Sequence, residues 1–115
     1  MKYKFNIKKR LFKPTIHNKL SDMGYINLNN YEQITFKSGK KKNDVTKMPW
    51  GYYLANSLNG TLYKNGFKTA LVLSNYQSSK KLFLNIVEIG KEKEFKKYLK
   101  LNEAKVLMWL NKIKL

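Results

Sequence analysis

The chain contains no cysteine, one histidine (His17) and one arginine (Arg10) among its 115 residues. The absence of cysteine excludes disulfides and thiolate metal sites, and it is typical of a cytoplasmic protein. A single histidine without cysteine or nucleophile-elbow glycines also argues against a serine or cysteine hydrolase triad. Any catalysis by this chain has to use side chains other than cysteine and a histidine-based triad.

Signatures of metal and cofactor chemistry are missing as well. The sequence has no phosphate-binding glycine loop, dinucleotide fingerprint or zinc-ligand spacing. Glu88, Glu92 and Glu94 form the only close group of carboxylates, and the lysines between them indicate a solvated turn rather than a metal site. We therefore expect a protein that is not an enzyme and that uses no metal or other cofactor.

Long hydrophobic runs are also absent. No apolar stretch approaches the roughly 18 residues of a membrane span, and the N-terminus lacks the apolar core of a signal peptide. We expect a cytoplasmic protein without a membrane partner. A length of 115 residues with 43% hydrophobic content suits a single domain over residues 1–115, with a homodimer as a possible assembly.

Acidic residues are scarce, and this is the strongest signal in the composition. The chain has 24 Lys and Arg residues against 7 Asp and Glu, a formal net charge of +17. An AT-rich genome accounts for the preference for lysine over arginine but not for the lack of acids. The imbalance favours a polyanionic partner, and nucleic acid is the natural choice.

Residues 67–89 predict a β-hairpin. Residues 67–74 form an apolar run rich in strand formers, a polar turn follows at 75–79, and residues 81–89 form the second strand. Strand side chains alternate between two faces, so Leu82, Leu84 and Ile86 share one face. This apolar face is expected to turn inward, and the opposite, solvated face carries the other set: Lys81, Phe83 and Asn85.

The segment 95–101 is predicted to be a third strand, with a solvated basic and aromatic row formed by Lys96, Tyr98 and Lys100. A cap at Asn102 then begins a helix over residues 103–113. A competing interpretation is one helix from Glu92 to the end of the chain.

The N-terminal half predicts short elements. Residues 1–9 alternate as an edge strand, residues 14–23 have the spacing of a short helix ended by Gly24, and residues 25–28 and 32–37 are strand-like. Residues 37–44 predict a mobile basic loop. Residues 49–59 fit a short helix, or a strand that leads into a turn at Asn59-Gly60. The predicted fold class is α+β: a twisted antiparallel sheet with a C-terminal helix on one face and one or two short helices in the N-terminal half.

Basic and aromatic side chains outside the hairpin complete the candidate binding surface. Lysines contact phosphates, and an exposed ring stacks on a base with roughly 1–3 kcal/mol of binding free energy. The further candidates are Lys8, Lys9, Arg10, Lys40, Lys41, Lys42, Trp50 and Tyr52.

The predicted hairpin, third strand and closing helix, with the wording Leu101-Asn-Glu-Ala-Lys-Val-Leu-Met-Trp-Leu-Asn-Lys-Ile113, resemble the single-strand-binding fold of the Whirly proteins and of the transcriptional coactivator positive cofactor four. The resemblance covers about residues 67–113 and is a pattern of elements rather than a motif. It implies a dimer or higher assembly whose sheets present basic and aromatic ridges to unpaired strands. Here the ridges would carry Lys81, Phe83, Asn85, Lys96, Tyr98 and Lys100.

These observations predict a protein that binds single-stranded DNA or RNA with little sequence preference. A chain with many lysines and a single arginine favours backbone binding over the reading of bases. Three alternatives remain. The first is a binder of duplex DNA or structured RNA, and the second is a small metal-independent ribonuclease that uses Lys, Tyr, Arg10 and His17. The third is an inhibitor that binds an acidic protein surface.

Overall fold

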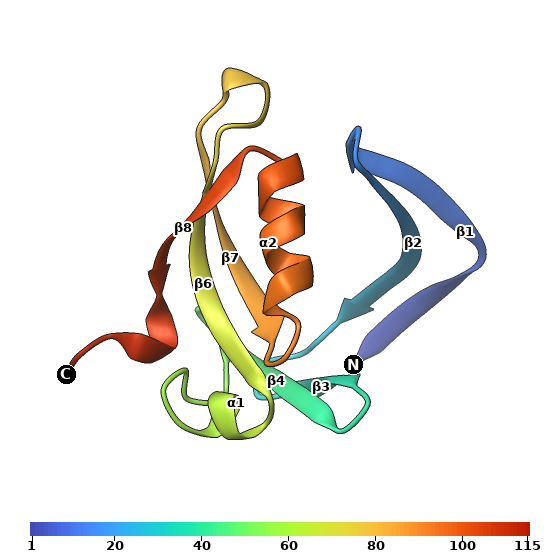
Figure 1. Cartoon of the computed structure of the whole chain (residues 1–115). Coiled ribbons are helices and arrows are strands. Elements are labelled where there is room, and N and C mark those ends of the chain that lie inside the picture. Colours follow the sequence, from blue (N-terminus) through green and yellow to red (C-terminus); the bar gives the residue numbers. More distant parts are fainter.

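The computed structural model describes residues 1–115, except for the side chains of residues 7–9. In this described part the strands form three small antiparallel sheets, with strand orders β1-β2, β3-β4-β5 and β7-β6-β8 (Figure 1). The strands are β1 (Lys2–Thr15), β2 (Asn18–Asn27), β3 (Gln33–Ser38), β4 (Lys41–Met48), β5 (Gly51–Leu54), β6 (Phe67–Ser74), β7 (Lys81–Glu88) and β8 (Ala104–Trp109). The helices are α1 (Thr61–Lys64) and α2 (Glu92–Leu101), with short 3-10 turns η1 (Tyr76–Ser78) and η2 (Leu110–Lys112).

The predicted hairpin over residues 67–89 is confirmed. Strands β6 and β7 pair without a register shift, from Phe67 opposite Glu88 to Ser74 opposite Lys81. The expected orientation of β7 is reversed: Leu82 and Leu84 are 61% and 53% exposed, whereas Phe83 lies opposite Val72, on the face that α2 covers. Strand β6 of this hairpin is the central strand of the C-terminal sheet, and β7 is an edge strand.

The predicted order of strand and helix after this hairpin is wrong. Residues 92–101 form helix α2, and residues 104–109 form strand β8. Strand β8 pairs antiparallel with β6 on the side opposite β7, so β7 and β8 run in the same direction. Parallel strands need a crossover connection, usually a helix, and α2 supplies it. The alternative of one helix to the end of the chain is wrong for the same reason.

The hydrophobic core lies between α2 and the sheet face it covers. Ala70, Val72 and Leu99 form its buried centre, and Phe95 packs edge-on against Trp109 with ring centroids 5.9 Å apart. A spacing of four residues places Phe95 and Leu99 on one side of a helix, which explains why α2 packs with this side on the sheet.

The N-terminal strands β1 and β2 form a long two-stranded arm that bows away from α2 in Figure 1. The helix predicted over residues 14–23 is wrong, because this segment contains the tip of the arm and most of β2. Gly24 does not end a helix. Its φ of +116° and its close approach to β1 leave no room for a side chain, since a Cβ atom would lie 1.9 Å from the Lys4 carbonyl oxygen.

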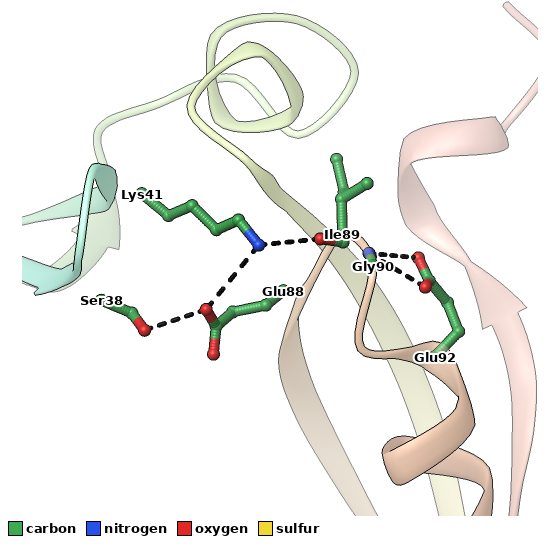
Figure 2. A network of polar contacts seen from close by, with 6 residues as sticks. All are labelled: Ser38, Lys41, Glu88, Ile89, Gly90 and Glu92. Carbon is green, nitrogen blue, oxygen red and sulfur yellow. Dashed lines mark hydrogen bonds and ion pairs between the residues drawn. The ribbon is translucent and has the colours of Figure 1, made fainter.

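The middle sheet corrects two further predictions. Residues 37–44, predicted as a mobile loop, turn from β3 into β4. Of the two predictions for residues 49–59, the strand is confirmed as β5 and the helix is wrong. Figure 2 shows how this sheet is fixed to the C-terminal one: Lys41 Nζ donates to the Ile89 carbonyl at 2.8 Å and lies 3.8 Å from Glu88 Oε1. Glu88 also accepts a hydrogen bond from Ser38 Oγ at 2.9 Å.

These findings overturn the predicted fold class. In the described structure the chain is mostly antiparallel strand in three small sheets, α2 is the only helix longer than one turn, and it lies between two strands rather than at the C-terminus. The radius of gyration is 15.7 Å, against about 13 Å for a compact domain of this length. The molecule is therefore open in shape.

Candidate nucleic-acid interface

A cavity of about 380 Å³ lies where the tip of the β1–β2 arm, the turn between β6 and β7, and the C-terminal end of α2 meet. Its volume falls within the roughly 300–1,000 Å³ of small-molecule sites. Rings, amides and hydroxyls line it, with Lys81 as the charged group among the described side chains. The lining is Pro14, Thr15, Asn18, Val72, Ser74, Tyr76, Gln77, Ser79, Lys81, Phe83, Leu84, Asn85, Tyr98, Asn102 and Ala104.

Strand β7 contributes the basic and aromatic side of the cavity. Lys81, Phe83 and Asn85 point to the sheet face that α2 covers, because they lie opposite Ser74, Val72 and Ala70 of β6. Phe83 remains 50% exposed. The sequence therefore grouped these three side chains correctly, and the structure adds the cavity beside them.

Helix α2 contributes a second ring. Tyr98 lines the cavity and is 42% exposed, whereas its neighbour Leu99 is buried against the sheet. The predicted row of Lys96, Tyr98 and Lys100 does not form, because residues two apart on a helix point in different directions. Lys96 and Lys100 are exposed on α2 away from the cavity lining.

A buried amide holds the cavity walls together. Asn102 is 4% exposed and ends α2. Its Oδ1 accepts a hydrogen bond from Thr15 Oγ1 at 2.8 Å, and its Nδ2 donates to the Tyr98 carbonyl at 2.9 Å. Asn102 thus fixes the arm to the helix turn that carries Tyr98.

The turn between β6 and β7 forms the third wall and is held in a strained conformation. Gln77 and Ser78 have φ angles of 54° and 59°, a left-handed region that non-glycine residues rarely occupy. The turn is fixed by Ser78 N donating to the Asn75 carbonyl at 3.0 Å, while the Tyr76 hydroxyl accepts from Ile16 N at 3.1 Å. Strain of this kind gathers at functional sites.

Electrostatics around the cavity favour an anion. None of its described lining residues is acidic, and exposed lysines that include Lys13, Lys19 and Lys80, against one exposed acid (Glu103), adjoin lining residues in the chain. Arg10 is less available than the sequence predicted, since its guanidinium lies 3.0 Å from Asp22. The Gly24 N–H and then the Arg10 side chain lower the pKa of that carboxyl, which keeps the pair charged.

The other predicted site residues lie apart from the cavity. Trp50 and Tyr52 are exposed around the β4–β5 turn, with Lys47 Nζ 5.7 Å from the Tyr52 ring centroid. Lys40 and Lys42 are exposed at the β3–β4 hairpin, whereas Lys41 is held by Ile89 and Glu88. The side chains of Lys8 and Lys9 lie outside the described part of the structure.

Sequence reasoning missed most of the polar wall of the cavity. Thr15, Asn18, Tyr76, Gln77 and Asn102 come from three segments of the chain that only the tertiary structure brings together. The local sequence pointed to two of these features. The polar composition of residues 75–79 predicted the turn, and the position of Asn102 between two apolar runs marked it as a cap.

Comparison with known proteins gives no relative. No family model, curated protein or solved structure matches this chain. Within the described residues, no three histidine or acidic side chains gather as a metal site would require, and no helix is long and apolar enough to cross a membrane. The cavity and its surroundings are therefore the basis for a functional proposal.

Proposed function

We propose that this protein binds single-stranded DNA or RNA with little sequence preference, and that the cavity beside β7 receives an unstacked base. The observation that carries the proposal is that Phe83 of β7 and Tyr98 of α2, two partly exposed rings, line one cavity together with Lys81. The net charge of +17 supports a polyanionic ligand.

In this proposal, different residues contact the phosphate and the base. Lys81 supplies an ammonium group for the backbone phosphate, and the ring of Phe83 or Tyr98 offers a face for stacking, worth roughly 1–3 kcal/mol per base. Asn18, Gln77 and Asn85 place amide groups at the wall, where they can hydrogen-bond to whichever base edge enters. Amides both donate and accept, which suits binding without strong base preference.

The cavity favours a single strand over a duplex. Bases in a duplex are stacked and paired, so a ring that lines a concave site cannot reach their faces without unstacking at a cost of a few kcal/mol. An unpaired strand has no such cost. This is also the binding mode that the resemblance to the Whirly proteins implies, and it rests here on the cavity and not on a shared topology.

Substitution of one cavity ring tests the proposal against a matched control. Phe83→Ala should weaken binding of a fluorescein-labelled 12-nucleotide single strand by about 5- to 150-fold, the loss of one stacked base. Phe36→Ala removes an equally exposed ring, also 50% exposed, from β3 and should leave affinity unchanged. Equal affinities for both variants in anisotropy titrations would show that stacking at the cavity does not contribute.

A nuclease control separates binding from catalysis. Labelled RNA incubated with the protein, with and without chelator, should remain intact if the cavity only binds. Cleavage that His17→Ala abolishes would instead support the ribonuclease alternative.

A further inference from the structure

Strand β7 has one edge without a partner strand. The C-terminal sheet has the order β7-β6-β8, so among the described residues β7 pairs with β6 alone (Figure 1). Natural edge strands are usually protected by prolines, bulges or a short length, because a free edge pairs readily with another chain. Strand β7 has eight residues, contains no proline and pairs with β6 without a register shift. The longer edge strands β1 and β2, and the other edge strand of this sheet, β8, all have such shifts, so β7 is the edge best suited to accept another strand.

The backbone groups at this free edge come from alternate residues. Ile89 N donates to the Gly66 carbonyl at 2.9 Å, which places these two residues in a hydrogen-bonded pair. Such pairs alternate with non-hydrogen-bonded pairs along an antiparallel ladder, so the odd-numbered residues of β7 direct their N–H and C=O groups to β6. The groups on the open side belong to Leu82, Leu84 and Ile86. These three residues can therefore bond a second extended backbone.

A continuous hollow runs beside this edge, between β7 and α2. The cavity described above lies at the Lys81 end of β7, and a second hollow of about 330 Å³ lies at the Val87 end. Asn85 and Tyr98 line both of them, so the two hollows adjoin. The apolar part of the second lining comes from Phe67, Ile86, Val87 and Phe95. The free edge is thus accompanied by one polar and one largely apolar pocket.

A strand added to this edge places its side chains in the two pockets. Side chains alternate along a strand, so every second side chain of a segment paired with residues 82–86 lies on the α2 side and enters a pocket. The remaining side chains lie beside Leu82 and Leu84, which are 61% and 53% exposed. Main-chain hydrogen bonds combined with pockets for alternate side chains are the recognition mode of a peptide that extends a sheet. A phosphate backbone or a lipid has no alternating N–H and C=O groups, so the edge itself selects a polypeptide.

Charge selects the composition of this polypeptide. Lys81 lines the cavity and the exposed Lys80 precedes it, so acidic side chains fit this end. At the other end Lys91 lines the second hollow together with Glu88 and Glu94, and the mixed charges and apolar lining favour an uncharged side chain there. A second copy of this chain is a poor occupant, because two protomers with a formal charge of +17 repel each other. An acidic segment is attracted by the same charge.

We infer that β7 binds an extended acidic segment of another protein, which adds a fourth strand to the C-terminal sheet beside α2. The segment bonds through its backbone to Leu82, Leu84 and Ile86. An acidic side chain enters the cavity near Lys81, and an apolar side chain enters the second hollow. The segment and a nucleic acid share the cavity, so each excludes the other. This competition rests on the proposed function, whereas the binding of the peptide does not.

Two synthetic peptides of eight residues, the length of β7, test the inference. Both alternate valine and threonine and carry glutamates at one end, and the second is N-methylated at its backbone amides, which removes the donors and keeps the charge. The unmodified peptide should bind the wild-type protein in fluorescence-anisotropy titrations. The methylated peptide should bind at least about 10-fold more weakly, since one backbone hydrogen bond changes affinity by about 2- to 12-fold. Equal affinities, or no binding at millimolar peptide, would overturn the inference.

Amide hydrogen exchange, measured by NMR on the wild-type protein, locates the added strand. The N–H groups of Leu82, Leu84 and Ile86 should exchange rapidly in the free protein and at least about 10-fold more slowly with the unmodified peptide bound. Those of Phe83 and Asn85 already bond to β6 and should change little. A bound peptide that protects none of the three edge amides would show attraction by charge alone and would contradict the inference.

A pair of substitutions at the edge completes the test. Leu82→Pro removes a donor on the open side, where proline is tolerated in edge strands. It should weaken the peptide complex by about 2- to 12-fold, and Leu82→Ala, which keeps the N–H, should weaken it less. Equal effects of the two substitutions would count against backbone pairing, and the two experiments on the wild type do not depend on the folding of the proline variant. No nucleic acid is present in these experiments, so their failure would leave the proposed function standing.

Discussion

Thr15 and Asn102 lie 87 residues apart in the chain, and the Thr15 hydroxyl donates to the Asn102 side-chain oxygen at 2.8 Å. This bond joins the tip of the β1–β2 arm to the end of α2. A two-stranded ribbon is only marginally stable by itself, so its attachment at this end depends on few contacts. The cavity exists because these two elements stay together.

Loss of this bond should loosen the arm. Thr15→Val removes the hydroxyl and leaves the Asn102 oxygen unpaired, which should lower the free energy of unfolding by about 1 kcal/mol. Hydrogen exchange of the amides around the arm tip should accelerate, while that of β6 should change little. Thr35→Val removes the hydrogen bond from Thr35 to Asp44 in the middle sheet and serves as control. Equal exchange rates at the arm tip in both variants would contradict the assigned role of Thr15.

Glu92 makes stability depend on pH. Its carboxylate accepts from the Gly90 N–H at 2.9 and 3.1 Å (Figure 2) and lies 3.2 Å from Lys68 Nζ. The backbone hydrogen bonds from Gly90 and Glu92 itself, followed by Lys68, lower the pKa of Glu92 from 4.5 to about 2. A depressed pKa stabilises the folded state above pH 4.5, and this stabilisation is lost as pH falls toward 2.

Glu92→Gln should therefore be less stable than the wild type at pH 7, with a difference that shrinks between pH 4.5 and pH 2. Thermal unfolding at stepwise pH values measures this difference. Glu94→Gln, an exposed position in the same first helical turn, controls for the interaction with the helix dipole. A difference independent of pH would show that packing, and not the charge of Glu92, is responsible.

The buried hydroxyl of Thr69 lowers the stability of the fold. Thr69 is fully buried in β6, and its Oγ1 has no hydrogen-bond partner among the described residues. Replacing an unsatisfied hydroxyl with a methyl group removes a desolvation penalty of about 1–3 kcal/mol. Thr69→Val should raise the free energy of unfolding by about 1 kcal/mol in urea titrations. A destabilised variant would indicate that a water molecule satisfies the hydroxyl.

Lys81 should account for one phosphate contact. Each neutralised phosphate of a single strand contributes about −0.7 to the slope of log affinity against log salt. Lys81→Ala should make that slope about 0.7 less negative, whereas Lys64→Ala, on α1 and away from the cavity lining, should not change it. An equal change of slope in both variants would mean that the positive charge attracts the strand without a defined phosphate site.

The sequence predicted the strands correctly where the two paired strands are neighbours in the chain. The β6–β7 hairpin joins adjacent segments with eight-residue alternation and a polar turn, so its sequence contains all the required information. Strand β8 pairs with β6 across 30 to 39 residues of chain, and residues 103–113 also fit a helical spacing. The choice between strand and helix there is made by the sheet and not by the segment itself.

The cavity could be predicted in part for the same reason. Lys81, Phe83 and Asn85 alternate along one strand, so their common face follows from sequence. Tyr98 was selected from a predicted strand that is a helix, and it lines the cavity only because α2 crosses the sheet. Thr15 and Asn102 could not be paired without knowing where the arm folds back.

The most direct test of the account is the affinity of the wild-type protein for matched single-stranded and duplex oligonucleotides, measured by fluorescence anisotropy from 0.05 to 0.5 M salt. A base-binding cavity predicts that the single strand binds more tightly at every salt concentration, and that its advantage remains when phosphate contacts are weakened by salt. Equal affinities, or tighter binding of the duplex, would contradict the central claim and assign the positive charge to a general attraction for polyanions.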